Sequence, residues 1–150
     1  MNDSSKDRVQ KEMKEKGLAH LSIDAELCAI ILRSEYKNRS VCFFTPGSFS
    51  QQMGYLPHKK GDVIRPHEHR VPAETVQYTQ EVLIVREGRM RVDFYDRGRR
   101  HRASEELGPG DIVMLCSGGH GFQFLEDTVL VEIKQGPYAG TRDRADYEEG

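Results

Sequence analysis

The stretch EVLIVREGRMRVDFY, residues 81–95, determines the predicted fold class of this chain. Its first half is a continuous apolar run, and its second half alternates apolar with polar or amphipathic side chains, the apolar ones being Met90, Val92 and Phe94. Glu87 and Gly88 separate the two halves, and a glycine between two such runs is typical of a tight turn. The pattern therefore predicts a β-hairpin with one face directed toward a core.

Short segments of the same kind follow one another along most of the chain. A second tight reversal, Gly108-Pro109-Gly110-Asp111, precedes another apolar run. Many short strands separated by glycine, proline and aspartate are typical of an antiparallel sandwich or barrel, so the predicted class is all-β. The expected strands are 26–33, 40–45, 52–57, 62–69, 79–86, 89–95, 111–115, 119–125 and 128–134.

The first 17 residues differ from the rest in composition and predict one short surface helix. Val9 and Met13 have helical spacing, and Gly17 can end the helix. The expected organisation is therefore an N-terminal helical and linker segment, a single β domain and a loose polar tail, over residues 1–21, 22–136 and 137–150.

The chain has 150 residues, and its acidic and basic residues nearly balance, which leaves a net charge of −2. This balance favours neither nucleic acid nor an anionic membrane as a partner, and no apolar run is long enough to span a bilayer. The polar N-terminus does not resemble a secretory signal, so we expect a cytoplasmic protein. Three separated cysteines suit free thiols, with Cys28 and Cys42 expected in the core.

Histidines provide the first indication of chemistry. His67 and His69 lie on an expected strand, which would direct both imidazoles to one face. Neutral imidazole is the commonest metal ligand, but taken alone such a pair is more often a surface or core feature. Arg65 shares the same face, where it would either meet an anionic substrate or pair with an acid at the mouth of the barrel.

Two further residues extend the candidate site. Glu81 begins a buried apolar run, where an unpaired carboxylate would be costly and coordination to a cation would remove most of the penalty. His120 lies in the glycine-rich stretch Ser117-Gly118-Gly119-His120-Gly121, which allows backbone and ligand to approach closely.

These residues resemble the cupin superfamily. Gly61, His67, His69, Glu81 and Gly88 follow its first motif apart from one interval, and residues 110–120 follow the second loosely. The resemblance spans residues 61–133 and implies a double-stranded β-helix, the cupin jelly-roll barrel. It also implies a metal held by three histidines and one glutamate, which here are His67, His69, His120 and Glu81.

The sequence departs from the family pattern in both motifs. Eleven residues separate His69 from Glu81 where the family has three or four, and Glu74 would satisfy the shorter spacing. Glu81 is preferred because it leads the apolar run and is followed by six residues and a turn glycine. In the second motif Cys116 replaces the usual proline and Phe124 replaces an asparagine.

The assignment of His120 rests partly on elimination of the other histidines, which are expected at the surface: His20, His58 and His101. Cys116 is interpreted as a pocket wall rather than a thiolate ligand. Tyr55 and Tyr78 are candidates for substrate binding, and Met90 and Phe94 are better explained as core. Mixed nitrogen and oxygen ligands admit Fe, Mn, Ni, Co, Cu or Zn as the single divalent ion.

The functional prediction is a metal-dependent enzyme, of oxygenase or isomerase type, acting on a small polar or anionic molecule. The resemblance implies a link to carbohydrate metabolism. The alternatives are a non-catalytic sensor of a metal or ligand and a metal-free sugar epimerase. The apolar segments Cys28–Leu32 and Val41–Phe44 predict a homodimer, and no basic recognition element indicates DNA binding.

Overall fold

The computed structural model describes residues 8–69, 79–136 and 147. The chain divides into two compact units. The first unit comprises residues 1–36 with 79–150, and the second comprises residues 37–78.

The described residues contain only strands as regular elements, which confirms the all-β class. They are β1 (Val9–Glu15), β2 (Leu18–Ile23), β3 (Glu26–Leu32), β4 (Cys42–Phe43), β5 (Gly54–Tyr55), β6 (Glu81–Glu87), β7 (Met90–Tyr95), β8 (His101–Leu107), β9 (Ile112–Leu115), β10 (Gly119–Phe124) and β11 (Val129–Lys134). In this part of the chain no helix has the length and apolar character needed to cross a membrane.

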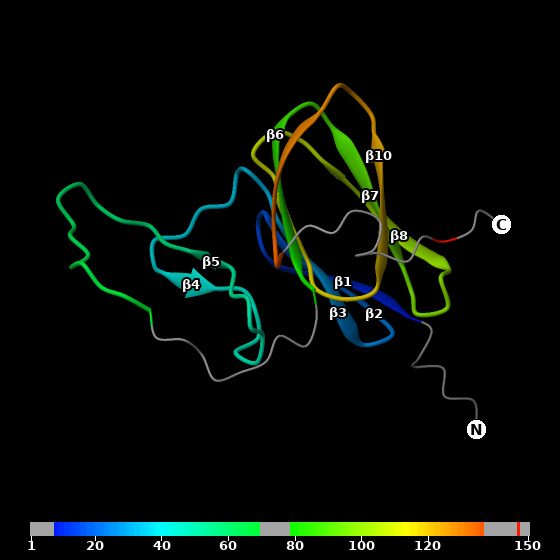
Figure 1. Cartoon of the computed structure of the whole chain (residues 1–150), viewed down its shortest axis with the longest axis horizontal. Helices are drawn as coiled ribbons and strands as arrows, with labels where there is room; N and C mark the ends of the chain where they lie inside the picture. The colour runs from blue at the N-terminus through cyan, green and yellow to red at the C-terminus, as the bar shows by residue number, and fades with distance from the viewer. Residues whose placement is uncertain (1–7, 70–78, 137–146, 148–150) are drawn as a thin grey trace. The chain divides into compact units, whose positions relative to one another are not determined.

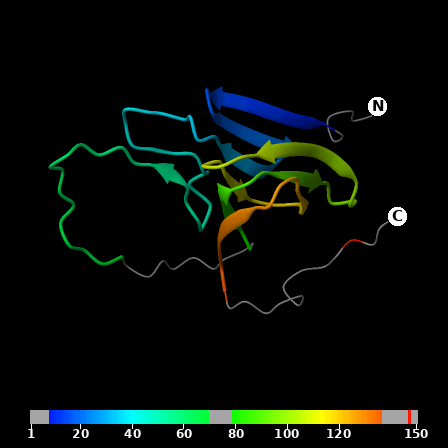
Figure 2. The ribbon, with the colours of Figure 1, turned by 90° about the horizontal axis from the view of Figure 1, so that it is seen from above.

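The first unit is built from two antiparallel sheets (Figures 1 and 2). One has six strands in the order β1-β2-β3-β9-β6-β11, and the other has three in the order β10-β7-β8. Apolar side chains of both sheets join in one core, which includes Leu83, Val85, Val113 and Leu115 from the larger sheet and Met90, Val92, Phe94 and Leu107 from the smaller. The unit is therefore a β-sandwich, and its described strands do not close into a single barrel.

The turn at Gly88 differs from its prediction. β6 and β7 flank it as expected, but β6 pairs with β9 and β11 whereas β7 pairs with β8 and β10. The segment therefore crosses from one sheet to the other and forms no hairpin. The prediction of one inward face was right, because Met90, Val92 and Phe94 are each at most 1% exposed.

The predicted N-terminal helix was wrong. Residues 9–15 form β1, which pairs along its length with β2, and Gly17 adopts a φ of +83° in the turn between them. The apolar stripe of the expected helix was only two residues wide, so little burial favoured a helix, whereas the ladder with β2 satisfies the backbone. The sheet therefore begins earlier than residue 22.

The second unit contains little regular structure. Its two short strands, β4 and β5, pair with each other inside the expected strands 40–45 and 52–57. The expected strand 62–69 was wrong, because all of these residues are exposed and form no ladder. Pro66 lacks an N–H group for pairing, and an isolated exposed strand would leave its backbone groups to water.

The three cysteines are free thiols, as predicted. Cys28 is buried in the core of the first unit, also as predicted, whereas Cys42 is only half-buried.

Candidate metal centre

Glu81 and His120 come together in the first unit. The Nε2 atom of His120 lies 3.4 Å from Oε2 of Glu81, although the two residues are far apart in sequence. Both side chains are mostly covered, with 29% of His120 and 19% of Glu81 exposed. The structure therefore brings these two predicted site residues together.

Strand register explains why Glu81 and His120 lie close together. Glu81 opens β6 opposite Leu115 of β9, and His120 lies opposite Phe94 of β7. Leu115 and Phe94 are core residues, and directly opposed side chains in an antiparallel ladder share a face. Glu81 and His120 consequently point inward from the two sheets.

The turn that leads into β10 depends on glycine. Gly118 has a φ of +77°, and a Cβ atom there would lie 3.1 Å from the carbonyl oxygen of Tyr95. Only glycine adopts this conformation without strain, so the glycine-rich stretch positions His120 by shaping the turn before it.

Two effects on the pKa of His120 oppose each other. Burial lowers the pKa of His120, while the neighbouring carboxylates of Glu81 and Glu132 act to raise it. The effect of burial is the larger one, so the pKa of His120 lies below its ordinary value.

His67 and His69 belong to the second unit and lie side by side there. Their ring centroids are 5.1 Å apart in an edge-to-face arrangement, although the segment is not a strand. Nδ1 of His67 is 2.9 Å from the carbonyl oxygen of Arg65. Because a carbonyl only accepts, this contact suits the neutral tautomer of His67 with its proton on Nδ1, in which the Nε2 lone pair is available to a metal.

The complete ligand set remains a prediction, since its four members are divided between the two units. Within residues 8–69, 79–136 and 147, no three acidic, histidine or cysteine side chains are gathered closely enough to hold an ion. Of the other candidates, Tyr55 is half-buried on β5 and Arg65 is exposed. Tyr78 and the rival ligand Glu74 lie outside the described residues.

Two of the three remaining histidines are exposed as predicted, namely His58 and His101. His20 is not a linker residue, because it lies on β2 and its Nε2 is buried without a hydrogen-bond partner among the described residues. Burial lowers the pKa of His20 as well.

Cys116 is buried at the end of β9. Its Sγ lies 3.6 Å from the carbonyl oxygen of Met114, and burial raises its pKa to about 12. A thiol that resists ionisation is a poor metal ligand, which agrees with a structural role for Cys116.

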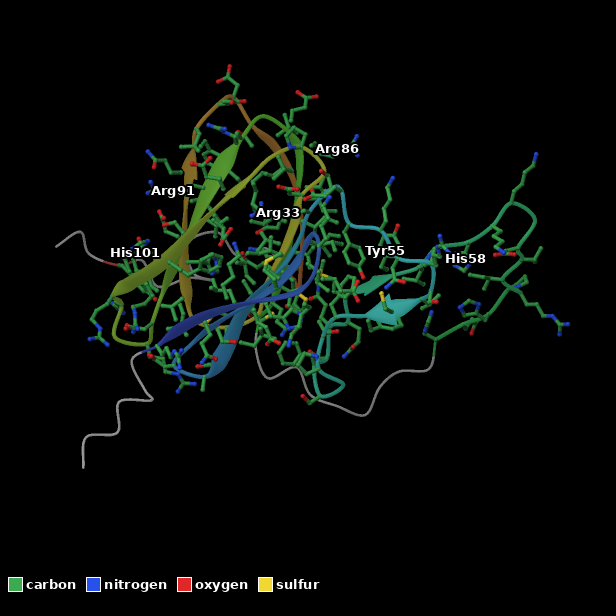
Figure 3. All side chains as sticks on the ribbon, turned by 180° about the vertical axis from the view of Figure 1, so that it is seen from behind. Arg33, Tyr55, His58, Arg86, Arg91 and His101 are labelled. Atoms are coloured by element: carbon green, nitrogen blue, oxygen red, sulfur yellow. The ribbon has the colours of Figure 1, made fainter. Side chains whose placement is uncertain are left out.

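Sequence reasoning missed a polar cluster on the outer face of the smaller sheet, two members of which, Arg91 and His101, are labelled in Figure 3. The Ser104 hydroxyl donates to Asp93 at 2.6 Å, and His101 Nε2 lies 2.9 Å from that hydroxyl. Two nitrogens of the Arg91 guanidinium donate to the two oxygens of the same carboxylate. Burial opposes ionisation of Asp93, yet hydrogen bonds from Arg91 and Ser104 hold its pKa below the ordinary value. Asp93 is therefore the acceptor that Arg91 and Ser104 share.

The contacts of Tyr147 were also not predicted, because the C-terminal residues were expected to form a loose tail. Its ring contacts Tyr95 edge to face at 5.4 Å, and the Arg99 guanidinium lies 4.9 Å from its centroid. The Tyr147 hydroxyl occupies the space that a side chain at Gly119 would fill.

Comparison with known proteins adds no relative: no protein-family model, curated protein or solved structure matches this chain.

Proposed function

We propose that this protein is a metal-dependent enzyme acting on a small polar or anionic molecule, with one divalent transition metal ion bound by His67, His69, Glu81 and His120. The observation that carries the proposal is the inward-facing Glu81 and His120 pair. The two facing antiparallel sheets support a cupin-type jelly roll as the scaffold.

The spacing of the pair suits two neighbouring ligands of one ion. Donor atoms about 2.0–2.1 Å from a tetrahedral zinc ion lie about 3.3 Å from each other. The 3.4 Å between Nε2 of His120 and Oε2 of Glu81 is close to that value. The available lone pair on Nε2 of His67 adds a third suitable donor.

When bound, such an ion supplies Lewis-acid or redox chemistry, which the proposed isomerase or oxygenase activity would use. Glu81 and His120 would fix its position because both are held on strands with core residues opposite them. Arg65, Tyr55 and Tyr78 are the proposed substrate-binding residues, and a homodimer is the proposed assembly.

Elemental analysis of protein purified without chelators or a nickel column tests the metal. We expect about one ion per chain in wild type and a large loss in His120→Ala and Glu81→Gln. The matched controls are His101→Ala and Glu87→Gln, which alter exposed residues and should retain the ion.

A wild-type protein without stoichiometric metal, or a His120→Ala variant that retains it, would overturn the proposal. A metal-loaded protein that binds a small molecule tightly without turnover would instead identify a sensor.

A further inference from the structure

β10 presents two glycines on the outer face of the smaller sheet. Gly119 lies opposite Tyr95 of β7, and Gly121 lies opposite Asp93. Successive residues of a strand point to opposite faces, and Phe94 belongs to the core, so its neighbours Tyr95 and Asp93 point outward. The outer face of β10 therefore offers a strip of backbone without side chains beside the Tyr95 ring.

Tyr147, near the C-terminus, occupies the space above Gly119. Its hydroxyl lies where a Cβ atom at Gly119 would be. Its ring contacts the Tyr95 ring edge to face, with centroids 5.4 Å apart and planes at 86°. This distance and orientation are those that aromatic pairs favour. Tyr147 therefore fits the strip although it is far from Tyr95 in the sequence.

Arg99 provides a third contact from the turn between β7 and β8. Its guanidinium carbon lies 4.9 Å from the centroid of the Tyr147 ring, within the range of a cation–π interaction. The φ of Arg99 is +63°, and its backbone N–H donates to the carbonyl oxygen of Asp96 at 2.9 Å. The turn therefore holds a cation over the ring in a backbone conformation that non-glycine residues adopt rarely.

The segment around Tyr147 is acidic, whereas the chain that contacts it is basic. Asp146, Glu148 and Glu149 flank the tyrosine in the sequence, and arginine stands at positions 97, 99, 100 and 102. Three of these arginines pair with carboxylates of the sandwich, and in the part of the chain that the structure describes Arg99 does not. Arg99 therefore complements an acidic segment in charge.

We propose that Tyr95, Arg99 and Gly119 form a docking site for a tyrosine within an acidic segment, and that Tyr147 of the same chain occupies it. The three contacts of the Tyr147 side chain carry the proposal. Gly119 is not left-handed, so the site requires glycine there for space and not for backbone conformation. The proposal is independent of the metal, because none of the four predicted ligands contributes to these contacts.

Limited trypsin digestion of the full-length protein measures the docking, because Arg144 closely precedes Tyr147. Gly119→Ala places a methyl group where the Tyr147 hydroxyl lies, and the loss of both ring contacts should speed cleavage after Arg144 about tenfold. Gly121→Ala is the matched control on the same face of β10. Its Cβ atom would lie 3.7 Å from the Tyr95 ring, an ordinary contact, so cleavage should keep the wild-type rate.

The peptide ADYEEG, residues 145–150, tests the occupant in the full-length Tyr147→Ala variant, whose docking site is vacated. The peptide should shift the amide resonances of Tyr95 and Arg99 at a concentration at least about tenfold lower than in wild type, where the chain's own tyrosine competes. The control peptide ADAEEG should leave these resonances unchanged. The peptide ADYQQG should bind more weakly than ADYEEG at low salt, because it lacks the two glutamates.

Equal cleavage rates in Gly119→Ala and Gly121→Ala would overturn the proposal, as would equal peptide binding by wild type and Tyr147→Ala. The peptide measurement applies even if Gly119→Ala does not fold. Protection of Arg144 that falls on dilution would overturn the assignment of Tyr147 to the same chain, because a second copy would then supply the tyrosine.

Discussion

Asp96, in the turn after β7, is a buried carboxylate held by several donors. The Arg100 backbone N–H and the side chains of Arg100 and Arg102 all donate to it, at 2.9–3.1 Å. These bonds, with that from the Arg100 backbone foremost, outweigh the opposing effect of burial and lower the pKa of Asp96 to about 2. The folded protein therefore favours the ionised form more strongly than the unfolded chain does.

This shift predicts a pH-dependent contribution to stability. Because the folded pKa lies below the ordinary value of 3.8, the contribution is complete above that value and is lost as the pH falls toward about 2. Urea unfolding at several pH values should show wild type more stable than Asp96→Asn at pH 6, with the difference shrinking between pH 4 and pH 2. The exposed control Asp127→Asn should show no such convergence, and a difference that is constant with pH would contradict the assignment.

At the residue scale, the sequence could single out a candidate site residue only where its immediate neighbours made it unusual. Glu81 and His120 stood out because a carboxylate before an apolar run and a histidine among glycines are unusual. The Asp93, Ser104 and His101 cluster did not, because its members become neighbours only through the pairing of β7 with β8. Register of that kind depends on tertiary packing and cannot be obtained from local spacing.

At the scale of elements, the turn at Gly88 is the connection on which the sandwich depends, since it carries the chain from one sheet to the other. Its φ is +78°, and a Cβ atom at this position would overlap the backbone oxygen of Asp127. Both the backbone conformation and the close approach therefore require glycine.

Gly88→Ala should consequently destabilise the fold by about 2 kcal/mol or more, from the left-handed conformation together with the backbone overlap. Gly108→Ala is the matched control, because a Cβ atom there meets nothing within 4 Å, and its effect should stay within about 1 kcal/mol. Chemical denaturation of the two variants would measure the contrast. Equal stability would show that the turn tolerates a side chain.

Most strands of the sandwich core were predicted well, because apolar runs and glycine turns mark them directly. The exception is β2, which supplies Ala19, Leu21 and Ile23 to the core but was assigned to the N-terminal linker. β3, β6, β7, β9, β10 and β11 all fall within a residue or two of the expected ranges. β8 was missed because its sequence, HRASEEL, is mostly polar, and it is a strand because β7 supplies a complete ladder beside it. β1 was taken for a helix for the same reason, since an exposed edge strand has no apolar pattern of its own.

At the scale of the whole molecule, Arg33 links the two sheets of the first unit from the end of β3 (Figure 3). Its guanidinium donates to Asp111 at 3.0 Å, to Glu105 of β8 at 2.9 Å and to the carbonyl oxygen of Glu106 at 2.6 Å. The two carboxylates are only 11% and 13% exposed, and Arg33 is the one cation that both of them contact among the described residues. Lys11 also pairs with Glu105, and the backbone N–H groups of Ser34 and Gly108 donate to Asp111.

Arg33→Met should therefore cost about 2–3 kcal/mol, because it leaves two mostly covered carboxylates without their shared cation. Arg97→Met is the comparison, since the Arg97 side chain is 81% exposed in its ion pair with Glu26 and should contribute less than about 1 kcal/mol. Guanidinium unfolding would compare the two. A loss at Arg33 no larger than that at Arg97 would show that the network does not join the sheets.

The homodimer remains a prediction. One of the two apolar segments from which it was predicted, residues 28–32 of β3, is buried within a single chain. That segment therefore needs no second copy to cover it. The other segment, in the second unit, still supports the prediction, because Val41 and Phe43 are 51% and 59% exposed.

The central claim is that His67, His69, Glu81 and His120 surround one metal ion. X-ray absorption spectroscopy of the metal-loaded protein at the metal edge tests it most directly. We predict a first shell of nitrogen and oxygen at about 2.0–2.2 Å, with outer-shell scattering from three imidazoles. A shell without imidazole scattering, or one that fits fewer than three imidazoles, would contradict the claim.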